Sequence, residues 1–187
     1  MSADWIWNRA REFTEVENND PDDLWEWIVD HGRQTWNDKR TEYGLHRFPM
    51  AHERLWPIAE RMVSEYAGDA TNIWSDKRPA EVRSRLERLG AGPQISSMIV
   101  GALSDTEQII GAGDVKADIH VRRVIGRVVE GDLVDEAKAI ELTRLVHPDD
   151  PWMLDRPLFE LGKQKCRPSN PLCSTCYLED VCTYAGA

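Results

Sequence analysis

The sequence predicts an all-α protein, and three observations support this fold class. Apolar residues recur at three- and four-residue steps in one segment after another, which is the period of an amphipathic helix. No run of useful length alternates apolar with polar residues, as a half-buried strand does. Proline and glycine fall at the ends of the periodic segments, where helices begin and end. The 187 residues are enough for one domain or two small lobes.

Two helices are expected in the first part of the chain, after a tryptophan-bearing opening segment at residues 5–15. An acidic stretch with Pro21 in its first turn begins one helix, through residues 24–28. Residues 44–49 are expected to form a loop. The next helix, over residues 55–66, has the clearest apolar stripe in the chain and must bury one face.

Five more helices are expected in the remainder of the chain. One begins at Pro79 and ends at Gly90-Ala91-Gly92, and the next begins at once with Pro93. Another begins near Asp118 and carries a stripe of valine and isoleucine. Two further helices lead to a cysteine-rich C-terminal part, at residues 134–146 and 151–161.

Composition and charge exclude several classes of protein. With 41% apolar and 30% charged residues, the chain is not disordered along its whole length. No apolar run approaches the length of a membrane span, and the first residues lack the pattern of a signal peptide, so we expect a cytoplasmic protein with no membrane partner. The net charge of −10 means that any nucleic-acid partner must be met through a local patch. The eight tryptophans are expected mainly in the core.

All four cysteines of the chain lie close together near its C-terminal end. Their spacing is Cys166-x6-Cys173-x2-Cys176-x5-Cys182. In a chain without an export signal, this clustering favours a metal centre over disulfide bonds. Four thiolates from one loop can hold a cubane iron–sulfur cluster or a tetrahedral zinc ion, and the spacing alone does not choose between them.

A glycine-containing turn separates two of the expected helices, in the segment Leu89-Gly90-Ala91-Gly92-Pro93-Gln94-Ile95. Glycines permit a sharp reversal with positive φ, and the following helix begins with unpaired N–H groups directed outward. An anion such as a DNA phosphate suits that position without any basic side chain. The alternative is a tight turn between helices with no ligand.

These two features together resemble the endonuclease III and MutY DNA glycosylases of the helix-hairpin-helix superfamily. The 6, 2, 5 cysteine spacing is similar to their 4Fe-4S loop, and Gly90-x-Gly92 before a helix is similar to their hairpin. The resemblance extends from the hairpin to the C-terminus and is thin before it. It implies two lobes. Residues 1–20 and 117–187 would form an iron–sulfur lobe with its cluster loop at 166–182, and residues 21–116 a helical barrel lobe with the hairpin at 89–95.

The resemblance also assigns a catalytic residue. The family pattern of an aspartate, one residue, a histidine and then an apolar-striped helix with an arginine matches Asp118, His120 and Arg122 or Arg123. An aspartate at a helix start is most often a cap, and the two roles are compatible because a capping carboxylate is held ionised and oriented. Bifunctional family members place a Schiff-base lysine where this chain has Gln94, so water attack without strand cleavage is implied. Lys116 is near Asp118 in sequence, but we do not assign it the missing role.

Further residues are expected at the DNA on the same basis. The cluster would be structural, with basic residues of its loop facing phosphate, and Arg122, Arg123 and Arg127 are expected on the outer side of their helix. The implied DNA-binding residues are Gly90, Gly92, Gln94, His120, Arg122, Arg123, Lys163, Lys165 and Arg167. The candidates for a base pocket or for a wedge that fills the gap left by a flipped base are Gln34, His31, Trp27 and Tyr43. Ordinary surface and helix-end roles are the alternatives for these side chains.

The resemblance implies a monofunctional DNA glycosylase without strong lyase activity. Such an enzyme would act as a monomer on double-stranded DNA, with a 4Fe-4S cluster as its cofactor. Two other hypotheses fit the same residues: an inactive iron–sulfur protein of this fold that only binds DNA, and a helical zinc protein with no role on DNA. The linker from residue 103 to 116 looks longer than in endonuclease III, and the part before the hairpin looks shorter. The base that is removed is therefore not predicted.

Overall fold

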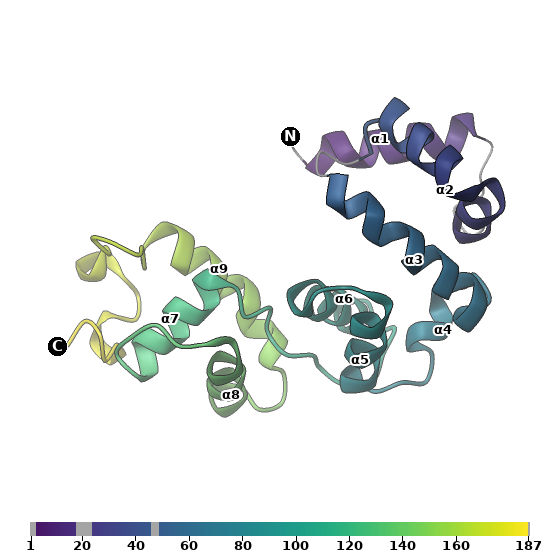
Figure 1. Cartoon of the computed structure of the whole chain (residues 1–187). Coiled ribbons are helices and arrows are strands. Elements are labelled where there is room, and N and C mark those ends of the chain that lie inside the picture. Colours follow the sequence, from purple (N-terminus) through teal and green to yellow (C-terminus); the bar gives the residue numbers. More distant parts are fainter. Residues whose placement is uncertain (1–2, 18–23, 46–48, 187) are drawn as a thin grey trace. The chain divides into compact units, whose positions relative to one another are not determined.

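The structure, a computed structural model, describes residues 3–17, 24–45 and 49–186. Within these residues the regular elements are α-helices and short 3₁₀ helices, and no strand is formed (Figure 1). The predicted all-α class is therefore confirmed. The chain forms two compact units: Met1–Ser75 with Arg88–Gly90, and Asp76–Glu87 with Ala91–Ala187.

The first unit is built from α1 (Ala3–Val16), α2 (Leu24–Glu42), α3 (Pro49–Tyr66) and the short α4 (Thr71–Trp74). Its core is largely aromatic, because edge-to-face rings fill space efficiently between helices. Phe13 of α1 packs edge-on against Trp27, Trp36 and Tyr43. Ile28 of α2 and Ala59 of α3 complete the buried cluster.

The helices of the first unit differ from the prediction at two points. α2 is bent at Gly32, whose φ of 81° and ψ of 161° are not helical, so it consists of two segments. α3 begins at Pro49, earlier than the start of its apolar stripe, and contains Pro57 in its interior. Of the predicted loop at 44–49, residues 46–48 lie outside the described part of the chain.

The second unit contains most of α5 (Pro79–Leu89), whose last two residues belong to the first unit, followed by α6 (Pro93–Asp105). After a long non-helical linker, α7 (Ile119–Val129), α8 (Glu136–Val146) and α9 (Asp155–Gln164) pack around one core. The predicted helix at 151–161 is divided into a 3₁₀ turn, η2 (Pro151–Leu154), and α9. Two more 3₁₀ turns lie in the C-terminal loop, η3 (Cys173–Thr175) and η4 (Glu179–Val181).

The core of the second unit centres on α7. Its apolar face consists of Val121, Val124 and Ile125, which are buried against residues of α8 and α9 such as Leu142 and Leu158. α7 packs on both of these helices. The linker residues Val115 and Ala117 enter the same core, and this burial brings the chain to the beginning of α7 in a fixed position.

The grouping of residues 1–20 with 117–187 concerns how the two lobes are arranged, and it stays a prediction. In the structure Phe13 contributes to the core of the first unit. Within the described residues, no helix is long and apolar enough to cross a membrane.

A glycine sets the close approach of α7 and α9. A Cβ atom at Gly162 would lie 2.9 Å from His120 Cβ and 3.0 Å from the His120 carbonyl oxygen. We expect Gly162→Ala to destabilise the second unit, because overpacking costs about 1–3 kcal/mol, more than the roughly 1 kcal/mol that alanine gains over glycine in a helix.

Urea unfolding followed by circular dichroism measures this effect. The control is Lys163→Ala, the next residue of α9, whose side chain is exposed and whose replacement is expected to change stability little. Equal midpoints for Gly162→Ala and the wild-type protein would show that the helices can separate without cost.

Candidate functional site

Asp118 is the N-cap of α7, as the sequence predicts. Its backbone is extended, with φ of −73° and ψ of 176°, and the side chain folds over the first turn of the helix. Oδ1 accepts hydrogen bonds from the backbone N–H groups of His120, at 2.8 Å, and Val121, at 3.0 Å. Both bonds orient the carboxylate at the N-terminus of the helix. The side chain is 14% exposed, so it is fixed but not sealed off.

The second oxygen of Asp118 faces a lysine. Lys116 Nζ lies 3.3 Å from Asp118 Oδ2, and its side chain is 19% exposed. The ammonium also lies over the ring of Phe159, 5.1 Å from the ring centroid. Lys116 is thus neither freely solvated nor available to a phosphate in this structure, because it forms an ion pair with the candidate catalytic carboxylate.

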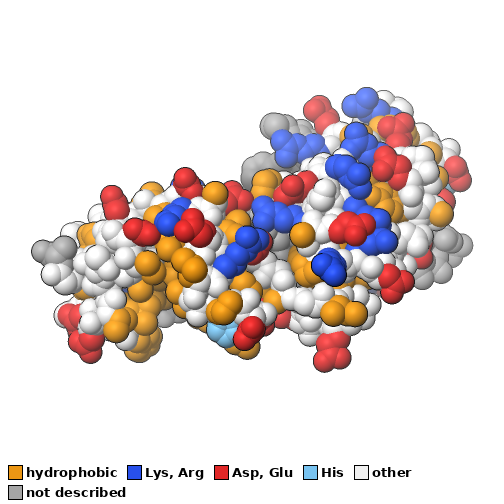
Figure 2. All heavy atoms as spheres, turned by 90° about the horizontal axis from the view of Figure 1, so that it is seen from below, with side chains coloured by type: hydrophobic (Ala, Val, Ile, Leu, Met, Phe, Trp, Pro, Cys, Tyr) orange, Lys and Arg blue, Asp and Glu red, His pale blue; other side chains and the backbone are white. Residues whose placement is uncertain are grey.

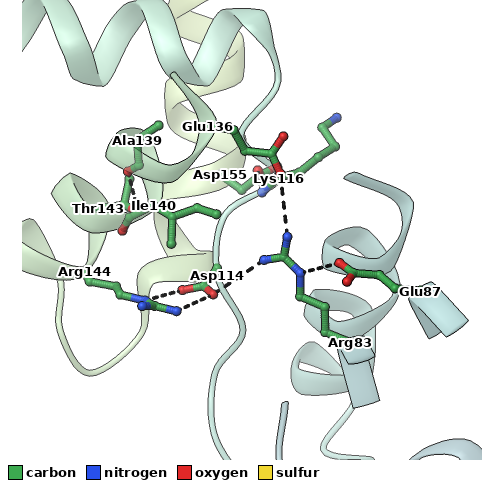
Figure 3. Close-up of polar contacts among 10 residues, drawn as sticks. All are labelled: Arg83, Glu87, Asp114, Lys116, Glu136, Ala139, Ile140, Thr143, Arg144 and Asp155. Carbon is green, nitrogen blue, oxygen red and sulfur yellow. Dashed lines mark hydrogen bonds and ion pairs between the residues drawn. The ribbon is translucent and has the colours of Figure 1, made fainter. Parts of the chain in front are cut away.

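Asp155 joins this pair through the backbone. Its Oδ1 accepts a hydrogen bond from the N–H of Lys116 at 2.6 Å (Figure 3). The carboxyl group is buried, and this desolvation raises the pKa of Asp155, as does the negative charge of Asp118. Sequence reasoning did not identify Asp155, which is the first residue of α9 and lies far along the chain from Lys116. The one available signal is an acidic residue at the start of a helix, which usually indicates an exposed capping residue.

The glycine turn has the local geometry that the sequence predicts at one of its two glycines. Gly90 has a φ of 108°, which favours glycine, whereas Gly92 is extended at −71° and 159° and acts as the N-cap of α6. The N–H of Ala91 donates to the carbonyl of Leu86 at 3.0 Å, closing the end of α5. Pro93 and Gln94 form the first turn of α6, and the Gln94 side chain is exposed.

Two of the three arginines of α7 are buried, so the prediction that they lie on its outer side is wrong. Arg123 is 4% exposed and Arg127 is 8% exposed. The guanidinium of Arg123 donates to the carbonyls of Cys166, at 2.6 Å, and Gly162, at 2.9 Å. Hydrogen-bonded in this way, Arg123 is not available to a DNA phosphate. Arg122 is partly exposed and donates through Nε to the carbonyl of Val134.

Arg127 attaches the C-terminal loop to α7. Its guanidinium donates to the carbonyls of Arg167, at 2.7 Å, and Pro168, at 3.1 Å, and it stacks 4.3 Å from the ring centroid of Tyr184. One N–H lies 3.5 Å from Cys166 Sγ. The Nε atom is buried and has no hydrogen-bond partner among the described residues. A positive charge and a spare donor therefore lie beside the cysteines.

The four cysteines line one cavity in the C-terminal loop, together with apolar residues of α7 and α9 and of the loop itself. Each of the four is partly buried, and none forms a disulfide. Partial desolvation raises the pKa of the Cys173 thiol, and the other three cysteines raise it further. Among residues 3–17, 24–45 and 49–186, no group of three histidine, cysteine or acidic side chains could hold a single metal ion.

The basic residues of the loop have separate environments. Lys163 is exposed, with its ammonium 5.8 Å from the centroid of the Phe159 ring, and Lys165 donates to Thr175 Oγ1 at 3.0 Å. Arg167 is exposed. Figure 2 shows one face of the molecule, on which basic side chains lie among acidic ones. This pattern agrees with the net charge of −10, which requires any DNA contact to be local.

The pocket candidates lie in the first unit. His31 stacks on Trp27 at 4.2 Å between ring centroids, and His31 Nδ1 lies 2.9 Å from the Trp27 carbonyl. Gln34 is exposed and donates to Asp38 at 2.9 Å. Tyr43 is a buried core residue whose hydroxyl donates to Glu17 at 3.0 Å. The pocket or wedge roles of all four residues stay predictions.

Comparison with known proteins gives one informative result. No protein-family model matches this chain. The chain is similar to Endonuclease III of Thermotoga maritima, with 23% identity over 144 residues. The match covers 76% of this chain and 60% of the relative, so the chain corresponds to less than two thirds of that protein. The similarity agrees with the resemblance found in the sequence.

Proposed function

We propose that this protein is a DNA glycosylase that hydrolyses the N-glycosidic bond of a damaged, mismatched or modified base. The observation that carries the proposal is the Asp118 carboxylate at the start of α7. One of its oxygens accepts hydrogen bonds from two helix amides, while the other lies 3.3 Å from the ammonium of the Lys116 side chain. The carboxylate is therefore oriented by the helix and keeps one face for a ligand.

The chemistry of base release calls for such a group. When the bond between base and sugar breaks, positive charge develops on the deoxyribose, and a fixed carboxylate lowers the energy of that transition state. The same oxygen can accept a proton from the attacking water. Gln94, at the start of α6, cannot form an imine with the sugar, so base release is expected to leave the strand intact.

We further propose that Cys166, Cys173, Cys176 and Cys182 hold a 4Fe-4S cluster. All four thiols line one cavity, and the resemblance of their 6, 2, 5 spacing to a 4Fe-4S loop favours the cluster over a zinc ion. The Arg127 guanidinium, with its spare Nε and its N–H beside Cys166, suits an anionic group. When bound, the cluster would cross-link the loop rather than act on the base.

Double-stranded DNA is the proposed partner of a monomeric, cytoplasmic enzyme. In the second unit, exposed Gln94, Lys163 and Arg167 are the side chains proposed to contact phosphate, together with the N-terminal amides of α6 after Gly92 and partly exposed His120, Arg122 and Lys165. Gly90 would allow the backbone to approach the DNA closely. The wedge and pocket roles of Gln34, His31 and Trp27 belong to the same proposal.

An alkali-cleavage panel tests the function. Duplexes that each carry one altered or mismatched base are incubated with the protein purified under anaerobic conditions, and the products are then split into samples with and without hot alkali. We expect one class of altered base to give a strand break that requires alkali. A complete panel with no break would reject the glycosylase, and a break without alkali would reject the monofunctional mechanism.

The alternative is an inactive iron–sulfur protein that only binds DNA. The ion pair between Lys116 and Asp118 favours it, because a lysine on the second oxygen reduces the negative charge available to a substrate. For this alternative, the same duplexes would be bound in a mobility-shift assay without loss of any base.

A further inference from the structure

Asp155 is an unusual residue in this chain because it is a buried carboxylate. It is 9% exposed and is the only acid among the buried side chains of the described residues. Removing a carboxylate from water is costly unless it is paired, and the cost appears as the raised pKa of Asp155. A side chain that costs stability at neutral pH needs another reason to be there.

The charges around Asp155 belong to the candidate site. Its Oδ1 accepts the N–H of Lys116, and the Lys116 ammonium lowers its pKa while Asp118 raises it. Lys116 comes from the linker, Asp118 from the start of α7, and Asp155 from the start of α9. Lys116 therefore contacts a carboxylate at each end: its backbone N–H donates to Asp155 at 2.6 Å, and its ammonium lies 3.3 Å from Asp118 Oδ2.

The linker before Asp118 is held at two points. Asp114 accepts two hydrogen bonds from the Arg144 guanidinium of α8, both at 2.7 Å, and Lys116 is held by Asp155 of α9 (Figure 3). Arg83 of α5 approaches Asp114 as well, at 3.9 Å. The first anchor is a partly exposed ion pair, whereas the second is a short bond to a buried carboxylate. Asp155 thus fixes the chain two residues before Asp118.

Net charge decides whether Asp118 can stabilise a cation. Asp118 and Lys116 alone form a neutral pair, which would offer little to a sugar that is becoming positive. Adding ionised Asp155 leaves the three side chains with one net negative charge. The second carboxylate therefore compensates for the lysine that faces the first.

We propose that Asp155 is a positioning residue for the Asp118 site, which anchors Lys116 and keeps the site net negative beside the Lys116 ammonium. The effect of Asp155 on catalysis rests on the proposed glycosylase function. The anchoring of Lys116 by Asp155 is a property of the DNA-free protein and is measured separately.

The variant Asp155→Asn keeps an oxygen that can accept the Lys116 N–H and removes only the charge. Its effect on stability has a defined sign. Because the pKa of Asp155 is raised by folding, the folded state holds its proton more tightly than the unfolded state, and wild-type stability relative to the variant rises as pH falls through the raised value. At neutral pH, Asp155→Asn is therefore expected to melt at or above the wild-type temperature, and this advantage is expected to shrink in acid.

Activity is expected to change in the opposite direction. On the base identified by the alkali panel, Asp155→Asn should lower kcat about tenfold, with little change in KM. This decrease corresponds to a rise of about 1.4 kcal/mol in the activation free energy. Removing the lysine charge as well, in Asp155→Asn with Lys116→Gln, restores one net negative charge and is expected to recover most of kcat. Glu160→Gln removes an acid from the same helix, and it is expected to leave kcat unchanged.

Amide hydrogen exchange at Lys116 tests the anchor. It is expected to stay slow in Asp155→Asn and to become at least about tenfold faster in Asp155→Ala. Four results would each overturn the inference. Asp155→Asn could melt below the wild-type temperature at neutral pH or retain full kcat, the double variant could stay inactive, or Asp155→Ala could leave the Lys116 amide protected. If Asp155→Ala does not fold, the melting temperature and kcat of Asp155→Asn and of the double variant still test the inference. A wild-type protein that releases no base rejects the proposed function and the catalytic role, while melting and exchange still decide the anchor.

Discussion

Replacing Asp118 with asparagine is expected to abolish base release while leaving the fold intact. Asparagine is as good an N-cap as aspartate, and its oxygen can accept the same bonds from the His120 and Val121 amides. The substitution therefore removes a charge and little else. Loss of a positioned acid–base group costs about 10²–10⁴ in rate, and the loss of charge stabilisation acts in the same direction.

Single-turnover base release from the substrate found in the panel is the measurement. Asp135→Asn is a matched control, because Asp135 caps α8 in the same way, accepting the Lys138 amide at 2.8 Å. It is expected to keep its activity. Circular dichroism and a DNA mobility shift should be unchanged in both variants. If Asp118→Asn releases base at more than a tenth of the wild-type rate, another group carries the chemistry.

The second large effect is expected at the cysteines. Cys173→Ala removes one of the four thiols that line the loop cavity, and we expect the anaerobically purified variant to lose most of its iron and sulfide. Without the cross-link, the loop after α9 retains few buried apolar contacts of its own, so it should be cut rapidly by protease. Ser174→Ala, at the neighbouring exposed position, is the control and is expected to keep the cluster.

Iron, sulfide and zinc analysis together with the visible absorption spectrum measures this outcome. A colourless wild-type protein that contains zinc without iron would contradict the cluster and favour the zinc alternative. Full iron content in Cys173→Ala would show that Cys173 is not a ligand.

Periodicity predicted the fold class and most helices because burial of one face dominates their stability. α6 and α7 begin where proline and aspartate signals place them. The start of α3 at Pro49 precedes its apolar stripe, so the stripe alone underestimates the helix. α4 has only four residues, too few to show a helical period, and the 3₁₀ turn η2 separates from α9 at a point that the apolar pattern does not mark.

The site was predictable in part. The cap role of Asp118 follows from local sequence, and so does the positive φ at Gly90. Arg123 and Arg127 were misplaced because an apolar stripe was taken to exclude charge from the buried side, whereas arginine can be buried when main-chain carbonyls receive its donors. The hydrogen bond from the Lys116 N–H to the Asp155 carboxylate joins two chain segments that only tertiary packing brings together, so the local sequence does not predict it.

The way in which Arg127 holds the C-terminal loop has a consequence for how this protein tolerates change. The partners of Arg127 at positions 167 and 168 are main-chain carbonyl oxygens, which every amino acid possesses. These hydrogen bonds therefore do not depend on the identity of the side chains at the two positions. Substitutions at positions 167 and 168 can therefore change the charge of the exposed side chains, and with it the affinity of the loop for a polyanion. The hydrogen bonds from Arg127 that attach the loop to α7 would remain.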